Sequence, residues 1–238
     1  MLGPLVNGSA LMFGAVFGAS FRRHTPERVK KALPLTCGVM AISIGTILCN
    51  KVNALPAVSL ALLAGALIGE LLYLEHGVER MVQWLQKLIT RVAPKLKQQQ
   101  DADHFIVKFV SITVLFCASG MGIFGATQEG MTGESNILLA KSVLDLFTAA
   151  IFAADLGYSV ALIAVPQVAI QSALFFGAQQ LMPLTTPTML ADFSACGGVI
   201  MLATGLRICG IKIFPIVNML PALILVMPIS ALWARLFA

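Results

Sequence analysis

The sequence predicts an all-α, polytopic membrane helix bundle of about eight spans that contains a three-span inverted-topology repeat. Of the 238 residues, 58% are hydrophobic and 11% are charged, whereas a soluble domain carries roughly 25% charged residues. The apolar residues come in runs of about 20, the length of a helix that crosses the hydrocarbon core of a bilayer. Three short motifs of the first part of the chain recur in the last part.

The apolar runs favour helices over a closed β-barrel. A barrel also satisfies its backbone groups in lipid, but its strands are short and alternate in polarity. We expect spans near residues 2–21, 32–50, 55–74, 105–124, 137–154, 158–181, 191–210 and 214–236. The first run lacks a positively charged beginning, so it is predicted to remain as a span and not to be cleaved as a signal peptide.

The positions of Lys and Arg predict the orientation of the chain. Basic residues gather in residues 22–31 and 75–108, and loops rich in Lys and Arg stay in the cytoplasm. Both segments are therefore expected inside, with both termini outside. Arg207 and Lys212 support an inner loop between the last two spans, whereas Arg235 near the outer end opposes this orientation.

Residues 78–92 have the pattern of an amphipathic helix. Val78, Met81 and Leu85 begin an apolar face, and charged or amide side chains occupy the other face. Two placements are open: the helix lies on the cytoplasmic membrane surface, or it extends the third span into water. Pro94 ends the pattern, and a polar linker follows.

The recurring motifs predict an internal duplication. Residues 9–15 resemble residues 172–178, Gly38, Gly45 and Cys49 recur 160 positions later, and the Asn-x-Leu-Pro-Ala motif of residues 53–57 recurs at 218–222. Apolar segments can match by chance, but three matches in the same order favour duplication. The copies are five spans apart, an odd number, so they would cross the membrane in opposite directions, as in many secondary transporters.

This repeat divides the chain into four parts. Residues 1–74 are repeat one with three spans, and 75–104 are the cytoplasmic amphipathic helix and linker. Residues 105–157 contain two connecting spans, and 158–238 are repeat two with three spans.

Polar residues at membrane depth are the candidates for a substrate or ion pathway. Lys141 and Asp145 are four residues apart, so on a helix they share a face and can pair. Ionisable residues within spans are costly and suggest function, although Lys141 could instead extend to the headgroup layer. Pro166 is predicted to interrupt the sixth span. The remaining candidates are amide or acidic side chains: Asn7, Gln128, Glu129, Gln167, Gln171, Asn53 and Asn218. Asn53 and Asn218 could alternatively cap the helices that follow them.

Several kinds of chemistry are not expected. The five cysteines form no CxxC motif and have no neighbouring His, so neither a metal site nor a disulfide framework is predicted. No nucleophile–base or phosphate-binding motif occurs, so we expect no enzyme and no cofactor. The net charge of +5 comes largely from loops beside spans, which favours anionic lipid over nucleic acid as the partner.

Four motifs resemble those of the YqgA-like family of bacterial inner-membrane proteins. They are the glycine-rich stretch at residues 122–130, Lys141-Ser142-x-x-Asp145, Gly197-Gly198 and residues 218–222. The resemblance covers nearly the whole chain. It implies a multi-pass protein of the bacterial cytoplasmic membrane, and it implies no substrate or activity.

The function expected from these features is a small-solute secondary transporter or permease. The alternatives are a channel, or a membrane adaptor or sensor without transport activity. A homo-oligomer is also expected, because small-residue faces such as Gly65-x-x-x-Gly69 could pack against a second copy.

Overall fold

The computed structural model describes residues 1–238 except 22–25, 79, 82, 85–101, 118 and 238. The described residues form helices and contain no strand, as predicted. The first part of the chain forms α1 (Leu2–Ser20), α2 (Glu27–Cys49) and α3 (Leu55–Leu71). The middle forms α5 (Ala102–Cys117), α6 (Gly120–Thr132) and α7 (Asn136–Leu156). The last part forms η3 (Gly157–Ile163), α8 (Ala164–Gln179), η4 (Met182–Leu184), α9 (Pro187–Ile208), α10 (Ile216–Met219) and α11 (Pro221–Phe237).

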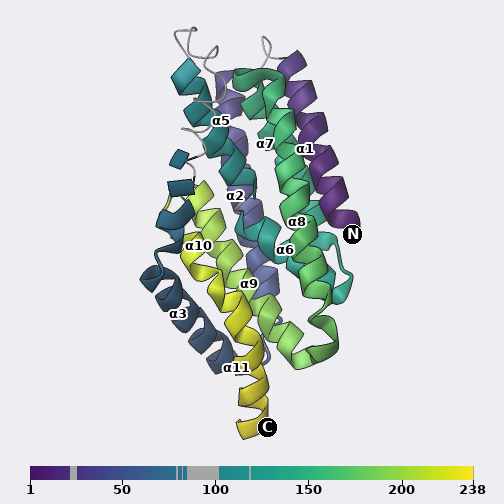
Figure 1. The fold of residues 1–238 in the computed structure, drawn as a ribbon, viewed down its shortest axis with the longest axis vertical. Helices are drawn as coiled ribbons and strands as arrows, with labels where there is room; N and C mark the ends of the chain where they lie inside the picture. Colours follow the sequence, from purple (N-terminus) through teal and green to yellow (C-terminus); the bar gives the residue numbers. More distant parts are fainter. Residues whose placement is uncertain (22–25, 79, 82, 85–101, 118, 238) are drawn as a thin grey trace.

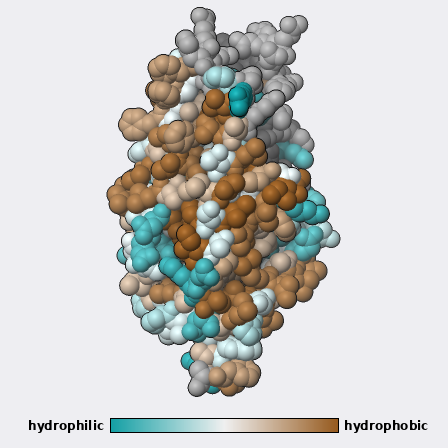
Figure 2. Space-filling model, turned by 180° about the vertical axis from the view of Figure 1, so that it is seen from behind, coloured by the Kyte–Doolittle hydropathy of each residue, from teal (hydrophilic) through white to brown (hydrophobic). Residues whose placement is uncertain are grey.

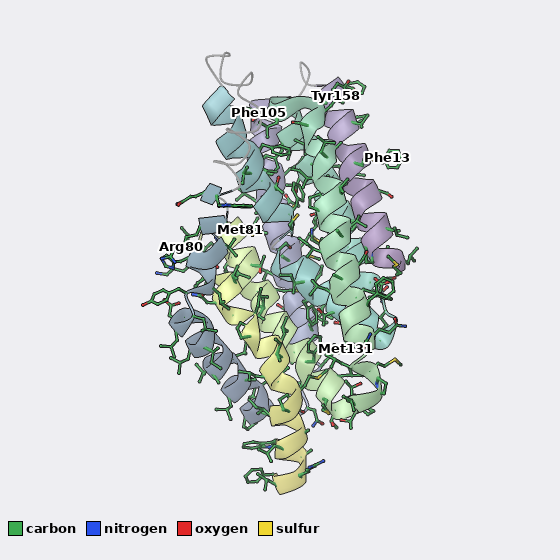
Figure 3. All side chains as sticks on the ribbon, in the orientation of Figure 1. Phe13, Arg80, Met81, Phe105, Met131 and Tyr158 are labelled. Carbon is green, nitrogen blue, oxygen red and sulfur yellow. The ribbon has the colours of Figure 1, made fainter. Side chains whose placement is uncertain are left out.

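The protein is a multi-pass membrane protein. Six described stretches are long and apolar enough to cross a membrane. One of them, residues 136–179, contains both α7 and α8, and the shorter α3 is apolar as well. Hydrophobic side chains cover most of the face in Figure 2, and some, such as Phe13 on α1, point away from the bundle (Figure 3). A hydrophobic surface of this extent is unfavourable in water.

The fourth predicted span is not one continuous helix, which corrects the expectation for residues 105–124. Helix α5 ends at Cys117 and α6 begins at Gly120. Between them Ser119 has an extended backbone (φ −70°, ψ 127°), and its side-chain oxygen accepts a hydrogen bond from the N–H of Gly122. Serine favours this position before a helix because it caps a free N–H group. The break puts the N-terminus of α6 inside the bundle.

The interruption of the sixth span lies before Pro166 and not at it. Residues 157–163 form the 3₁₀ segment η3, and α8 begins at Ala164. Pro166 is therefore in the first turn of α8, where a missing N–H costs no hydrogen bond within the helix.

Glycines allow α2 and α9 to pack closely in opposite directions. A Cβ atom at Gly45 would lie 2.7 Å from the carbonyl oxygen of Gly198, and one at Gly205 would lie 2.6 Å from that of Gly38. Helix backbones approach this closely only where side chains are absent. The first half of α2 therefore packs on the last part of α9, and the end of α2 packs nearer the beginning of α9.

The glycines of α3 also pack against other helices of the same chain. Gly65 packs against the backbone of Ala222, and Gly69 packs against Asn218. Both glycines are buried by α10 and α11. These two glycines therefore pack within the chain, and the homo-oligomer stays a prediction without a contact face assigned to it.

Most of the predicted amphipathic helix at 78–92 lies outside the described residues. Residues 74–78 are helical. The side chains of Met81 and Trp84 are exposed.

Candidate functional site

Helix α7 places Lys141 and Asp145 on its inner face. The two side chains are one turn apart and form an ion pair between Lys141 Nζ and Asp145 Oδ2. Lys141 is 2% exposed and Asp145 is 7% exposed, so both side chains point into the bundle and not onto its surface. The Cβ of a larger residue at Gly122 would lie 2.9 Å from Lys141 Cε, so this glycine of α6 leaves the space that Lys141 fills.

Three amide side chains surround the carboxylate of Asp145. Asn7 on α1 donates from Nδ2 to Asp145 Oδ2 over 2.8 Å. Gln167 on α8 donates from Nε2 to the same oxygen and to Asn7 Oδ1, both over 2.7 Å. Gln171 donates from Nε2 to Asn7 Oδ1, also over 2.7 Å. The structure thus brings five of the predicted pathway residues into one buried group, called here the Asp145 network: Asn7, Lys141, Asp145, Gln167 and Gln171.

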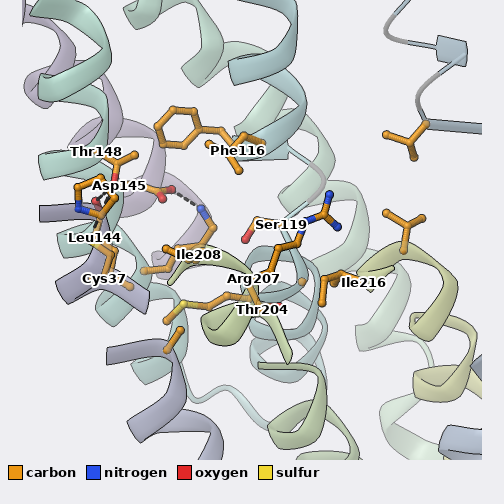
Figure 4. A pocket seen from close by; sticks show the side chains of 18 of the residues that line it. Cys37, Phe116, Ser119, Leu144, Asp145, Thr148, Thr204, Arg207, Ile208 and Ile216 are labelled. Carbon is orange, nitrogen blue, oxygen red and sulfur yellow. Dashed lines mark hydrogen bonds and ion pairs between the residues drawn. The ribbon is translucent and has the colours of Figure 1, made fainter. Parts of the chain in front are cut away.

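A cavity of about 870 Å³ lies beside this network, which is a typical volume for a small-molecule site. Residues of α2, α5, α6, α7, α9 and α10 line it. Lys141 and Asp145 reach it from α7. In Figure 4, Arg207 on α9 lies across the cavity from Asp145. Leu144, Phe116 and Ile216 provide apolar wall.

A second ion pair lines the same cavity. Arg207 donates to Glu75 Oε1 over 2.7 Å and to the carbonyl oxygen of Phe214 over 3.0 Å. Glu75 also accepts the N–H of Val217 through Oε2 over 3.0 Å, which holds the beginning of α10. This pair is partly exposed, unlike the pair on α7.

The N-terminus of α6 faces the cavity through Ser119, Gly120 and Met121. The first N–H groups of a helix have no partner within it, and together they carry a partial positive charge. With Lys141, they make the inner wall of the cavity attractive to a negatively charged or polar group.

Two predicted residues of α6 are buried but do not line the cavity. Glu129 accepts the backbone N–H of Gly3 through both oxygens, at 3.1 and 3.2 Å, and so caps the beginning of α1. Gln128 is 4% exposed, and its Oε1 has no hydrogen-bond partner among the described residues.

The two predicted asparagines lie at helix ends and outside the Asp145 network. Asn53 is exposed, and its backbone N–H donates to Asp192 Oδ1 over 2.8 Å. Asn218 is buried, accepts the N–H of Glu75 over 2.8 Å and donates to Glu70 Oε2 over 2.5 Å. Their contacts stabilise the ends of α3 and α10.

Sequence reasoning missed Asp192, Arg207 and Glu75 as site or support residues. Asp192 is fully buried and accepts from Ser230 Oγ over 2.6 Å as well as from the beginning of α3. An acidic residue within the span predicted at 191–210 was the available signal. Arg207 was used only as support for an inner loop, and Glu75 was not considered, because both lie near span ends.

No group of three His, Cys, Asp or Glu side chains in the described part of the chain could hold a metal ion.

Comparison with known proteins places the chain in a family. The family described as "Protein of unknown function (DUF554)" matches residues 2–231. The chain belongs to this family. It is 51% identical to "Uncharacterized protein YqgA" of Escherichia coli (strain K12) over 238 residues, which is the full length of both chains. It is 25% identical to "Uncharacterized membrane protein YdfK" of Bacillus subtilis (strain 168) over 231 residues, which are 94% of this chain and 93% of that protein. No solved structure matches the chain.

Proposed function

We propose that this protein is a secondary transporter, or permease, of a small solute in the bacterial cytoplasmic membrane. The observation that carries the proposal is the buried Lys141–Asp145 pair, which opens onto a cavity of about 870 Å³. The energetic cost of burying two charges makes a purely structural role a poor explanation for the pair. A pair that lines a cavity can also exchange partners with a solute.

The packing of α2 on α9 supports an inverted repeat. A Cβ atom at Gly38 would lie 2.5 Å from Cys209 Sγ, and one at Gly198 would lie 3.0 Å from Cys49 Sγ. Gly38 and Gly198 are 160 positions apart, and so are Cys49 and Cys209. Exchanging the two copies therefore turns one contact into the other, as a two-fold rotation would do.

An inverted repeat is the arrangement in which many secondary transporters bind their solute, between the two copies and near the middle of the membrane. The cavity is lined by both proposed copies, since Cys37 and Ala41 belong to α2 and Thr204 and Arg207 belong to α9. Helix packing between the copies would then control from which side a solute reaches Lys141 and Asp145.

The expected orientation puts the Glu75–Arg207 pair toward the cytoplasm. Glu75 begins the basic segment of residues 75–108 that is expected inside, and Arg207 lies near the inner loop of residues 209–215. Pro34 and Phe152, from the cytoplasmic halves of α2 and α7, also line the cavity. In this orientation the cavity lies in the inner half of the protein, and the conformation described here faces inward.

The side chains that a channel would use do not line this cavity. Gln167 and Gln171 were two of the pathway candidates of the sequence, and both instead donate to Asn7 inside the Asp145 network. A transporter that binds and releases its solute fits this arrangement better than a continuous pore.

Uptake into proteoliposomes tests the proposal. The purified protein is reconstituted and offered radiolabelled amino acids, organic acids, nucleosides and inorganic anions, with and without proton and sodium gradients. We expect at least one class to accumulate above the level of protein-free liposomes. Uptake equal to the protein-free level for every class, in every gradient, contradicts the proposal.

A further inference from the structure

The carboxylate of Asp145 has one oxygen that no other residue uses. The donors from Lys141, Asn7 and Gln167 all bind its Oδ2. Its Oδ1 accepts no hydrogen bond in the described part of the chain, yet protein atoms do not enclose it. Because Asp145 lines the cavity, this free oxygen faces it. An ionised carboxylate accepts hydrogen bonds through both oxygens, so Oδ1 is ready for a donor from a solute.

Lys141 has unused donors at the same place. An ammonium group has three N–H donors, and among the described residues that of Lys141 binds Asp145 alone. Lys141 lines the cavity as well, and its Nζ lies 5.8 Å from the centre of the Phe116 ring in the cavity wall. The two side chains are 2% and 7% exposed. A deeply buried pair therefore presents both a free donor and a free acceptor to the cavity.

The second ion pair of the cavity has no free acceptor. Glu75 accepts from Arg207 through Oε1 and from the N–H of Val217 through Oε2. The solute-binding charges are therefore those of the pair on α7.

The charges around the cavity favour a solute without net charge. The described charged residues that line it are two cations and two anions, whose charges sum to zero: Lys141, Arg207, Asp145 and Glu75. An anion or a cation would bring an unbalanced charge into a site that is largely removed from water, which is costly. A zwitterion brings both charges and leaves the sum at zero.

We propose that the cavity binds a zwitterionic amino acid with an apolar side chain. Its ammonium group donates to Asp145 Oδ1, and its carboxylate accepts from Lys141 Nζ. Both groups of an amino acid are attached to one carbon and lie about 3 Å apart, close to the separation of an ion pair. Each charge of the pair on α7 then has two opposite neighbours, and the pair itself stays intact. Phe116, Leu144 and Ile208 line the cavity (Figure 4) and surround the apolar side chain.

Thermal unfolding of the purified full-length protein in detergent, followed by light scattering, tests binding without transport. The probes are leucine, 4-methylpentanoate, which is leucine without its amine, and 3-methylbutylamine, which is leucine without its carboxylate. They are compared at one pH and one ionic strength. A ligand that binds the folded state raises the Tm with its concentration, so we expect a saturable rise in leucine. Each analogue lacks one hydrogen bond between charged groups and should need a concentration about tenfold higher or more for the same rise.

A Tm that leucine does not raise, or that either analogue raises at the same concentrations, overturns the proposal. An amino acid as the transported solute rests on the proposed function, whereas its binding in the cavity does not. Uptake of another solute class, with no effect of leucine on the Tm, overturns the amino acid site and leaves the transporter. A rise in leucine without uptake of any class supports the site and contradicts transport.

Variants that remove one charge should reverse the preference among the same three probes. Asp145→Asn leaves the charge of Lys141 unbalanced, so this variant should respond to 4-methylpentanoate at lower concentrations than to leucine. Lys141→Met leaves the charge of Asp145 unbalanced and should respond best to 3-methylbutylamine. Ser142→Ala removes a hydroxyl that donates to Leu138 O and does not line the cavity, so it should keep the wild-type order. A preference for leucine that is unchanged in the two folded charge variants overturns the site, and the wild-type comparison stands if they do not fold.

Discussion

Asp145 Oδ2 accepts hydrogen bonds from side chains on three helices. Lys141 on α7, Asn7 on α1 and Gln167 on α8 all direct their donors to this one oxygen. Hydrogen bonds to an ionised group are about twice as strong as those between neutral groups. The carboxylate therefore holds the three helices together and at the same time faces the cavity.

Removing one member of the pair should destabilise the protein more than removing both. Lys141→Met leaves a buried carboxylate without its cation, and Asp145→Asn leaves a buried ammonium, so each is expected to cost roughly 3–5 kcal/mol. The double variant buries no charge and should recover part of that loss. The measurement is a double-mutant cycle on unfolding in detergent. Single losses that simply add in the double variant contradict the pairing.

The spacing in the sequence was sufficient to predict the pair but not the network. Residues four apart on one helix share a face, so Lys141 and Asp145 followed from their positions. Asn7 and Gln167 are 160 residues apart, and only the packing of α1 on α8 brings them together. From the sequence, both are polar residues within spans, and nothing in it indicates that they contact Asp145 or each other.

At the scale of the helix, the break between α5 and α6 determines what faces the cavity. A continuous helix would satisfy its N–H groups internally. The extended Ser119 instead leaves the N-terminal groups of α6 beside Lys141. Hydropathy could not reveal this break, because the residues on both sides are apolar.

Ser119→Ala should destabilise α6 because the alanine cannot cap the N–H of Gly122. A lost N-cap costs about 1 kcal/mol. Ser135 precedes α7 in the same position but makes no capping hydrogen bond, so Ser135→Ala is the matched control and should be neutral. Thermal unfolding of the two variants measures the difference. Equal Tm values for both variants would show that Ser119 does not cap α6.

The glycines between α2 and α9 should tolerate no side chain. Gly45→Ala and Gly205→Ala both place a Cβ against backbone carbonyl oxygens, and overpacking of this kind typically costs 1–3 kcal/mol. Since the contact of Gly45 with Gly198 and that of Gly205 with Gly38 are reciprocal, the two variants should lose similar amounts of unfolding free energy.

Gly177→Ala provides the control for these glycine variants. Gly177 lies in α8, and a Cβ there would meet nothing within 4 Å, so the substitution should be neutral or stabilising. Unfolding measurements on all three variants in the same detergent test the comparison. A neutral Gly45→Ala would contradict the close packing of the two helices.

At the scale of the whole molecule, the described helices follow the order of the apolar runs, but the run at residues 105–124 is divided into α5 and α6. Hydropathy was sufficient for the order, because an apolar run of about 20 residues marks a span wherever it occurs. The position of the cavity was not predictable, because it depends on the angles at which α2, α7 and α9 pack. The reciprocal contacts between α2 and α9 agree in register with the repeat expected from the sequence.

The orientation of the molecule can be tested by thiol labelling in intact cells. Lys51 follows α2, Lys212 follows α9, and both side chains are exposed. Because α2 and α9 run in opposite directions, the two lysines are expected on opposite sides of the membrane. With residues 22–31 and 75–108 inside, Lys51→Cys should react with an impermeant maleimide added outside, and Lys212→Cys should react only after the cells are permeabilised. The reverse pattern would invert the orientation and put the cavity toward the outside.

The proposed function requires that transport depend on the Lys141–Asp145 pair. The measurement is uptake of the accumulated solute into proteoliposomes that contain equal amounts of folded protein. Asp145→Asn keeps the shape of the side chain but removes its charge, so its uptake is predicted to fall to the protein-free level. Ser142→Ala, one residue from Lys141 and not part of the Asp145 network, is predicted to transport as the wild type does. Wild-type uptake by folded Asp145→Asn would contradict the account.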